Sequence, residues 1–568
     1  MSKPIRSHFT LIEAACAKYP DAPAFRVPVL DPGTSDKLAE WKAISYKKFS
    51  GDILTQASFW GLILRQHGAE KGSVVSVWYR EWLCRIEGMS YADVTLTYGL
   101  SRAGYTVELI SLSIPSPEAV FDLIRLANSK FLICDSSKRS PIQDTETQSK
   151  CPVPVHWYSS SDHYYRNIAA GVKPDQEMPK TVEELVKDPK GIAFILHTSG
   201  STSGRPKLVP WSWEWLDMTI ESLPGFHELS KGAVSWIGNA CHAGQNLSMI
   251  NVFFHCLSVV QPTRLDFSSD ELKDMVKRCN LRMLLQFPSY FAAHVKRART
   301  DPELLQILRD LEGIYLGGMA LTEDDLAWCV HKGLPLVLAF GSTEYGLLLK
   351  SKPVTIPPVY EVNVEPEALA FMSIHDDTAN DQDTSENEED LKELIVLGTS
   401  KRCPASSLTA QDGNFHTGDL FVEVGPGKYE SRGRGDDWIK LANAGRCDTR
   451  AIEANVLHTC PDIVHACVII GSLRPEIVLV VEYIPSISST PQLSPEDEDK
   501  IKTDILQRLA PVQAKMWGYE KVLHKRQIRV VEKGSLPRTG SKGNIRRKEV
   551  ERAYKSELDR VYVEGFRA

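Results

Sequence analysis

Phe194-Ile-Leu-His-Thr-Ser-Gly-Ser-Thr-Ser-Gly-Arg-Pro-Lys-Leu-Val209 is the stretch that decides how this chain is interpreted. An apolar, strand-like run opens into a loop of glycine, serine and threonine, and Arg205 and Lys207 follow it. Small residues let backbone N–H groups approach phosphate oxygens, hydroxyl groups add donors, and the cations balance negative charge. The GxxxxGK[ST] spacing of a Walker loop is absent, so the stretch predicts a phosphate loop of another kind. Taken alone, it also fits a polar turn at the end of a strand.

Strand-like and helix-like segments alternate on both sides of this loop, which predicts an α/β protein with largely parallel sheets. The expected strands are short, apolar and rich in β-branched residues: 73–78, 130–134, 191–196, 283–286, 313–316, 334–339 and 394–397. Helical spacing of apolar residues lies between several of them, at 116–128, 269–279 and 303–311.

Composition places the chain among ordinary globular proteins, and its 568 residues are too many for one core. The net charge of −7 gives no overall attraction to nucleic acid or to an anionic membrane. The 12 cysteines form no CxxC pair, which favours reduced thiols. The N-terminus lacks the apolar core of a signal peptide, and no apolar run reaches the ~20 residues of a membrane span. We therefore expect a cytoplasmic protein with neither nucleic-acid nor membrane partners.

Three breaks interrupt the α/β pattern. Residues 375–390 are acidic and almost without apolar side chains, so we expect a solvated loop; an acidic docking patch is the alternative. Residues 431–437 combine two glycines with charges, as at a hinge between domains. Residues 486–499 are rich in serine and proline and predict a further loop.

Four more segments follow the phosphate loop in a fixed order. They are Leu316-Gly-Gly-Met-Ala-Leu321 with Phe340-Gly-Ser-Thr-Glu-Tyr-Gly346, Phe415-His-Thr-Gly-Asp-Leu-Phe421, Gly433-Arg-Gly-Asp-Asp-Trp-Ile-Lys440 and Leu536-Pro-Arg-Thr-Gly-Ser-Lys-Gly543. Together the five resemble the adenylate-forming superfamily of acyl-CoA synthetases, luciferases and peptide-synthetase adenylation domains. The 198–207 loop is one residue longer than that family's usual TSG[ST]TGxPK. The resemblance covers nearly the whole chain.

This resemblance implies a large N-terminal domain over residues 1–432, made of two packed α/β sheets and a β-rich portion. It implies a hinge over 433–437 that pivots at Asp436, and a smaller, mobile α/β domain over 438–568 that ends in a linker-like helix. The implied enzyme is an AMP-forming ligase that uses ATP and Mg²⁺ to convert a carboxylic acid to an acyl-adenylate.

The resemblance also assigns roles to residues, each with a physical reason. The resemblance places the polyanionic phosphates of ATP at the phosphate loop. It makes Glu344 the carboxylate that binds Mg²⁺ and puts Thr343, next to Glu344, near the α-phosphate. Asp419 suits the ribose hydroxyls and Arg434 the ribose or phosphate, while Lys542 stabilises charge on the reacting carboxylate and α-phosphate. The implied nucleotide site comprises Thr198, Ser199, Gly200, Ser201, Thr202, Lys207, Gly317, Gly318, Phe340, Gly341, Ser342, Asp419 and Arg434.

Two departures from the family pattern matter. The lysine loop ends in Lys542-Gly543 instead of Gly-Lys, which leaves Lys533 and Lys548 as alternatives. The usual GxRIE is replaced by a variant over 443–453 that looks most like the adenylation domains of fungal adenylate-forming carboxylic acid reductases. Those proteins load the acid on a carrier domain; here residues 546–562 would be the linker to a carrier, and neither a carrier serine motif nor a dinucleotide fingerprint follows.

The acid is expected to bind near 236–245, where the candidate pocket residues are Asn239, His242, Gln245, Phe287 and Gly317. No Asp or Glu lies between Val234 and Phe254, so nothing there pairs with an α-ammonium group. This favours an acid without an α-amino group, aromatic or short and polar. His242 lines or gates the pocket, or is a structural histidine.

We therefore expect a carrier-loading adenylation domain of the reductase type, excised from a longer chain or serving a partner. A free-standing acyl-CoA ligase is the alternative enzyme, and an adenylate-binding regulatory domain is the alternative without activity. The thiol acceptor is thus the phosphopantetheine of a carrier domain or CoA.

Overall fold

The computed structural model describes residues 5–31, 38–79, 90–111, 117–135, 149–158, 178–179, 181–186, 188–198, 207–220, 222, 232–318, 321–374, 390–435, 438–441, 446–472, 474, 476–484, 493–513, 516, 520–538 and 545–565. Contacts divide the chain into two compact units. The first comprises residues 1–198, 205–417 and 422–431, and the second comprises 199–204, 418–421 and 432–568. Within the described segments, no helix has the length and apolar character required to cross a membrane.

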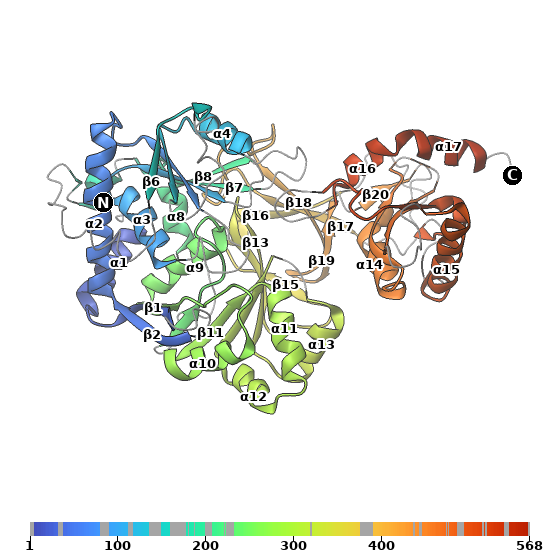
Figure 1. Ribbon diagram of the computed structural model, residues 1–568, viewed down its shortest axis with the longest axis horizontal. Coiled ribbons are helices and arrows are strands. Elements are labelled where there is room, and N and C mark those ends of the chain that lie inside the picture. Colours follow the sequence, from blue (N-terminus) through green and yellow to red (C-terminus); the bar gives the residue numbers. More distant parts are fainter. Residues whose placement is uncertain are drawn as a thin grey trace. The chain divides into compact units, whose positions relative to one another are not determined.

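A six-stranded sheet forms one layer of the first unit, in the order β6-β5-β3-β4-β7-β8. The first five strands are parallel, and β8 returns antiparallel to β7. Their bounds are β3 Val74–Tyr79, β4 Thr106–Ser111, β5 Phe131–Asp135, β6 Val155–Tyr158, β7 Ile192–Thr198 and β8 Lys207–Ser212. The accompanying helices are α1 His8–Lys18, α2 Tyr46–Gln66, α3 Tyr91–Arg102, α4 Pro117–Leu126, α7 Val182–Leu185 and α8 Trp213–Thr219 (Figure 1).

The second sheet has 13 strands among the described residues, in the order β16-β17-β18-β19-β15-β14-β13-β12-β11-β9-β10-β1-β2. Strands β1, β10, β9, β11, β12 and β13 run parallel, and the β13–β14, β14–β15, β15–β19 and β16–β17 pairs are antiparallel. The bounds are β1 Pro23–Leu30, β2 Leu38–Ser45, β9 Ala233–Ser235, β10 Ser258–Val260, β11 Leu281–Gln286, β12 Gly313–Gly317, β13 Leu336–Ser342, β14 Gly346–Ser351, β15 Val359–Val362, β16 Leu369–Ser373, β17 Leu391–Val396, β18 Phe415–Gly425 and β19 Lys428–Arg434.

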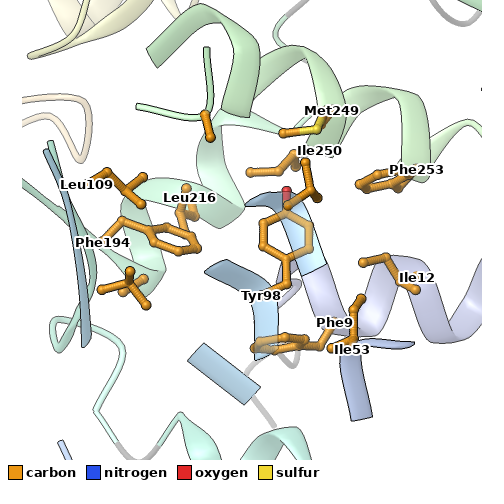
Figure 2. Packing of buried hydrophobic residues seen from close by; sticks show 14 of the residues in the cluster. Phe9, Ile12, Ile53, Tyr98, Leu109, Phe194, Leu216, Met249, Ile250 and Phe253 are labelled. Atoms are coloured by element: carbon orange, nitrogen blue, oxygen red, sulfur yellow. The ribbon is translucent and has the colours of Figure 1, made fainter. Parts of the chain in front are cut away.

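Helices α9 Ala243–Phe254, α10 Ser269–Cys279, α11 Pro288–Ala298, α12 Pro302–Asp310 and α13 Glu323–His331 complete the first unit. Its main core joins residues of both sheets, such as Phe194 from β7 and Leu285 from β11. Figure 2 shows Tyr98 of α3 at the centre of this core, with Phe194 on one side and Ile250 and Phe253 of α9 nearby.

The second unit contains a two-stranded sheet, β20–β21, and a three-stranded sheet in the order β22-β23-β24. Its elements are β20 Trp438–Lys440, β21 Arg446–Asp448, α14 Thr449–Thr459, β22 Val464–Ile470, β23 Val478–Tyr483, α15 Pro495–Gln513, β24 Ile528–Val531, α16 Arg547–Ala553 and α17 Lys555–Gly565. Strand β23 begins with four consecutive apolar residues, and both of its faces are covered: Leu479 and Val481 join one core cluster, Val478 and Val480 the other.

The predicted fold class is confirmed, and each predicted strand and helix has a counterpart in the structure. The expected loop over 486–499 is wrong at its end, because α15 begins at Pro495 and its acidic first turn suits a helix N-terminus. Residues 546–562 form two helices broken at Tyr554, and both pack through Val550 and Leu558. The acidic segment 375–389 lies outside the described residues.

Candidate active site

Four adjacent parallel strands of the large sheet end at the same edge. Strands β9, β11, β12 and β13 pair in parallel, and their carboxyl ends lead into Trp236, Phe287, Gly318 and Thr343 respectively. In α/β sheets, ligands bind in crevices at the carboxyl ends of the strands. This edge therefore gathers most of the residues predicted for the adenine, metal and acid sites.

The predicted metal residue Glu344 lies in the short turn between β13 and β14. Gly341 permits this hairpin, because a Cβ there would lie 2.3 Å from the carbonyl oxygen of Gly346. Ser342 Oγ donates to Glu344 Oε2 at 2.8 Å and accepts from the Glu344 backbone N–H at 3.2 Å. The carboxylate is thus held through one oxygen, and among the described residues Oε1 accepts no hydrogen bond.

The described part of the chain contains no group of three His, Cys, Asp or Glu side chains that could hold a metal ion. Mg²⁺ is commonly bound by one or two carboxylates together with substrate phosphates instead of by a protein cage. The single pre-oriented carboxylate of Glu344 fits such an ion, provided that a nucleotide supplies the remaining oxygens.

Thr198 and Lys207 face each other across the β7–β8 pair, at the neck of the predicted phosphate loop. Ser199, Gly200, Ser201 and Thr202 of that loop lie outside the described residues. Among the predicted phosphate-binding residues, the structure therefore gives the positions of the two that anchor the loop.

A buried charged residue near this neck was missed by the sequence reasoning. The carboxylate of Glu108 in β4 is fully buried, accepts a hydrogen bond from Ser76 Oγ, and has Oε1 3.4 Å from His197 Nε2. An acid within the apolar run 106–111 was the signal that could have revealed it.

The predicted adenine-contacting residues lie on β12, β13 and the turn after β12. Gly317 packs against β13, where a Cβ would be 3.3 Å from the Ala339 carbonyl oxygen. Gly318 has a φ of +95°, which glycine adopts without strain, and its ideal Cβ position is 3.8 Å from the Phe287 ring. Phe340 makes an edge-on contact with Tyr360, and burial raises the pKa of Tyr360 to about 12.

The predicted acid-pocket residues include two aromatic rings and two polar side chains. His242 precedes α9, and its ring is perpendicular to that of Phe287 with centroids 5.1 Å apart. The Gln245 side chain is fully buried, and its Oε1 accepts from the backbone N–H groups of Ile237 and Gly238 at 2.7 and 3.2 Å. Gln245 therefore shapes the pocket loop through its oxygen, while Asn239 Oδ1 accepts from Cys241 Sγ at 3.1 Å.

Asp419 and Arg434, both predicted at the ribose, lie beside each other. Their closest atoms, Oδ1 and Nη1, are 3.5 Å apart. Gly418 has a φ of +72°, and a Cβ on it would lie 3.0 Å from the Arg434 guanidinium, so glycine makes room for this pair. Asp436 and Lys542 lie outside the described residues.

Comparison with known proteins gives two family matches. Residues 12–367 match the model of the AMP-binding enzyme family, and residues 436–565 match that of the AMP-binding enzyme C-terminal domain. The chain is 30% identical over 539 residues to the AMP-binding domain-containing enzyme iboA of Amanita muscaria, covering 94% of this chain and 98% of the relative. It is 24% identical to the adenylate-forming reductase Nps10 of Heterobasidion annosum, covering 84% of this chain and 43% of the reductase.

Solved structures share the fold at low sequence identity. The o-succinylbenzoate CoA synthetase of Bacillus subtilis, in complex with an acyl-adenylate, superposes with a TM-score of 0.68 at 14% identity. That match covers 95% of this chain and 97% of the synthetase. MatB of Rhodopseudomonas palustris, with ATP bound, gives a TM-score of 0.67 at 17% identity, covering 96% and 99%.

Proposed function

This chain belongs to the AMP-binding enzyme family and is an adenylate-forming ligase, and from that premise we propose that it activates a small carboxylic acid for transfer to a phosphopantetheine thiol. In the first step the carboxylate attacks the α-phosphorus of ATP, giving an acyl-adenylate and pyrophosphate. In the second step the thiol attacks the acyl carbon, giving a thioester and AMP.

The observation that carries this proposal is the fixed turn of Ser342, Thr343 and Glu344 at the carboxyl ends of parallel strands. Glu344 would hold Mg²⁺ through the carboxylate oxygen that does not bond to Ser342, and the bound ion would supply positive charge beside the departing pyrophosphate. Lys207 and the loop it closes bind the β- and γ-phosphates, while Asp419 accepts from the ribose hydroxyls with Arg434 beside it. Lys542 supplies positive charge to the reacting carboxylate and the α-phosphate.

We propose an acid without an α-amino group. The segment 234–254 contains no acidic side chain, and His242 and Phe287 offer aromatic surfaces with a ring geometry that suits an aromatic or short polar acid. A buried ammonium group would require a carboxylate partner that this segment does not supply.

A carrier domain is the proposed acceptor, because an adenylate-forming reductase is among the relatives. CoA is the second candidate acceptor, because a CoA synthetase is among the solved structures that share the fold.

The test is a panel of carboxylic acids in ATP–pyrophosphate exchange, followed by single-turnover transfer to CoA and to a phosphopantetheinylated carrier. We expect exchange with non-amino acids and none with their α-amino counterparts. Exchange confined to α-amino acids would refute the substrate class, whereas transfer to CoA alone would replace the carrier with CoA. Absence of AMP formation with every acid would refute the proposed activity.

A further inference from the structure

Two tryptophans directly follow the phosphate-loop neck. Trp211 lies near the end of β8, four residues after Lys207, and Trp215 lies in the first turn of α8. Ser212 caps α8 by accepting from the Trp215 backbone N–H at 3.1 Å, which fixes the spacing of the two side chains. Their rings stack with centroids 4.6 Å apart and planes at 24°, and both are buried.

This tryptophan pair contacts the turn that carries Glu344. Trp211 Nε1 donates a hydrogen bond to the backbone carbonyl of Thr343 at 2.9 Å. The Trp215 ring lies 3.5 Å from the position that a Cβ on Gly346 would occupy. The pair therefore touches the turn on both sides of Glu344.

Strand β8 thereby connects two parts of the proposed nucleotide site. Residues 207 and 211 point to the same face of the strand, about 13 Å apart along it, given a rise of about 3.3 Å per residue. Trp211 belongs to the six-stranded sheet, and Thr343 lies in the turn between β13 and β14 of the 13-stranded sheet. The hydrogen bond from the Trp211 indole N–H thus links strand β8, which follows the phosphate loop, to the turn that carries Glu344.

We propose that Trp211 is a positioning residue, whose N–H holds the Thr343 carbonyl so that Glu344 presents its free oxygen to Mg·ATP. The proposal rests on the proposed function, because it assigns Trp211 an effect on the metal and nucleotide through Glu344. Without this donor the part-buried Thr343 carbonyl would lose its indole partner, and the turn would move to recover one.

The chain itself offers a matched control. Trp215 lies in the same stack, but its Nε1 has no hydrogen-bond partner among the described residues. Trp211→Phe and Trp215→Phe therefore make the same reduction in ring size, and only the first removes a hydrogen bond.

The experiment measures exchange activity as a function of Mg²⁺ concentration, with calorimetry of Mg·ATP binding in parallel. Trp211→Phe should raise the half-saturating Mg²⁺ concentration and weaken Mg·ATP binding about tenfold, with an unchanged KM for the acid. Trp215→Phe should keep both within about twofold of the wild type. Equal effects of the two variants, or an unaffected Trp211→Phe, would overturn the proposal.

Calorimetry separates this proposal from the proposed function. If the wild type fails to activate any acid, the proposed function falls, yet Mg·ATP binding still shows whether Trp211→Phe differs from Trp215→Phe. If the wild type is active and the two variants bind Mg·ATP equally well, only the positioning role of Trp211 falls.

Discussion

Glu482 and Arg538 form a part-buried, two-point ion pair in the second unit, with Oε1–Nη1 and Oε2–Nη2 distances of 2.8 and 2.6 Å. Glu482 is fully buried in β23 and also accepts from the Leu536 backbone N–H at 2.9 Å. Burial by itself would raise the pKa of Glu482, but the bonds from Arg538 and from backbone N–H groups outweigh it and lower the pKa. Glu482 therefore anchors Leu536 and Arg538 to β23.

Glu482→Gln should destabilise the protein, because it leaves the Arg538 cation without its charge partner. Arg538 is partly exposed, so the expected cost is that of the lost hydrogen bonds to a charged group, about 1.5–3 kcal/mol. The measurement is urea unfolding at neutral pH, where the wild-type carboxylate is ionised. Glu476→Gln is the control, because Glu476 and Arg526 form a more exposed pair whose loss should cost about 1 kcal/mol or less. Equal losses in the two variants would contradict the anchoring role of Glu482.

Glu344→Ala should impair exchange most strongly at limiting Mg²⁺ while leaving the thermal unfolding midpoint nearly unchanged. It removes a proposed metal ligand and no core packing, since among the described residues the side chain bonds only within its own turn. The check is a Mg²⁺ titration of exchange beside Glu361→Ala, which removes an exposed carboxylate from β15. Unchanged activity of Glu344→Ala at limiting Mg²⁺ would refute the assignment.

The sequence predicted those features that short-range patterns determine. The helix expected over 269–279 has those bounds, because Ser268 caps it and Leu272, Met275 and Cys279 recur on its buried side. The roles expected for Gly341 and Glu344 rested on a motif and stay predictions; the hairpin shows why glycine is needed at 341 and how Ser342 holds the Glu344 carboxylate.

Long-range contacts could not be predicted in this way. The Trp211–Thr343 bond joins a strand of one sheet to a turn of the other across 132 positions of sequence, and no local pattern tells which carbonyl a buried indole meets. Gln245 is a candidate pocket residue by sequence, and its oxygen accepts from two backbone N–H groups of the preceding loop. These bonds depend on how α9 packs against the loop that contains Ile237 and Gly238, which a single sequence does not specify.

Tyr98→Phe should increase the free energy of unfolding by up to about 1 kcal/mol. The Tyr98 hydroxyl lies in the apolar core shown in Figure 2, and among the described residues it has no hydrogen-bond partner, so its removal ends a desolvation cost. Tyr46→Phe is the matched control, because the buried Tyr46 hydroxyl donates to the Leu257 carbonyl at 2.7 Å. That variant should lose about 1–2 kcal/mol. Urea unfolding of both proteins checks the contrast, and a similar loss in both would contradict it.

His416 should make stability depend on pH near neutrality. Its ring nitrogens lie 3.1 Å from Glu393 and 3.1 Å from Asp412, and these bonds raise the pKa of His416. A raised folded-state pKa means that the stabilisation is complete below about pH 6.5 and is lost as the pH rises through the folded-state value. His416→Gln should therefore reduce the free energy of unfolding at pH 5.5 and have less effect at pH 9.

The control for His416 is His458→Gln, which alters an exposed histidine of α14. Its effect should be small at both pH values. A difference between His416→Gln and the wild type that stays constant, or grows, from pH 5.5 to 9 would show that the two carboxylates do not hold a protonated ring.

Lys542 and Asp436 give the last prediction, which rests on the sequence motifs, because both residues lie outside the described part of the chain. Activation needs a cation beside the α-phosphate, and thioester formation needs an entry path for a thiol at the same carbon. One fixed surface can hardly provide both, so we expect the second unit to rotate about Asp436 between the steps. Lys542→Ala should slow adenylation by about 10²–10³-fold and leave transfer from preformed acyl-adenylate nearly unchanged. Asp436→Pro should do the reverse, because proline fixes φ at the pivot.

Both half-reactions are measured for both variants, with Lys533→Ala and Lys548→Ala as controls. Lys542 is not the catalytic lysine if Lys542→Ala slows both steps equally or slows neither, or if a control variant gives the selective loss. The departure of Lys542-Gly543 from the family's Gly-Lys order would then be explained by a catalytic lysine elsewhere.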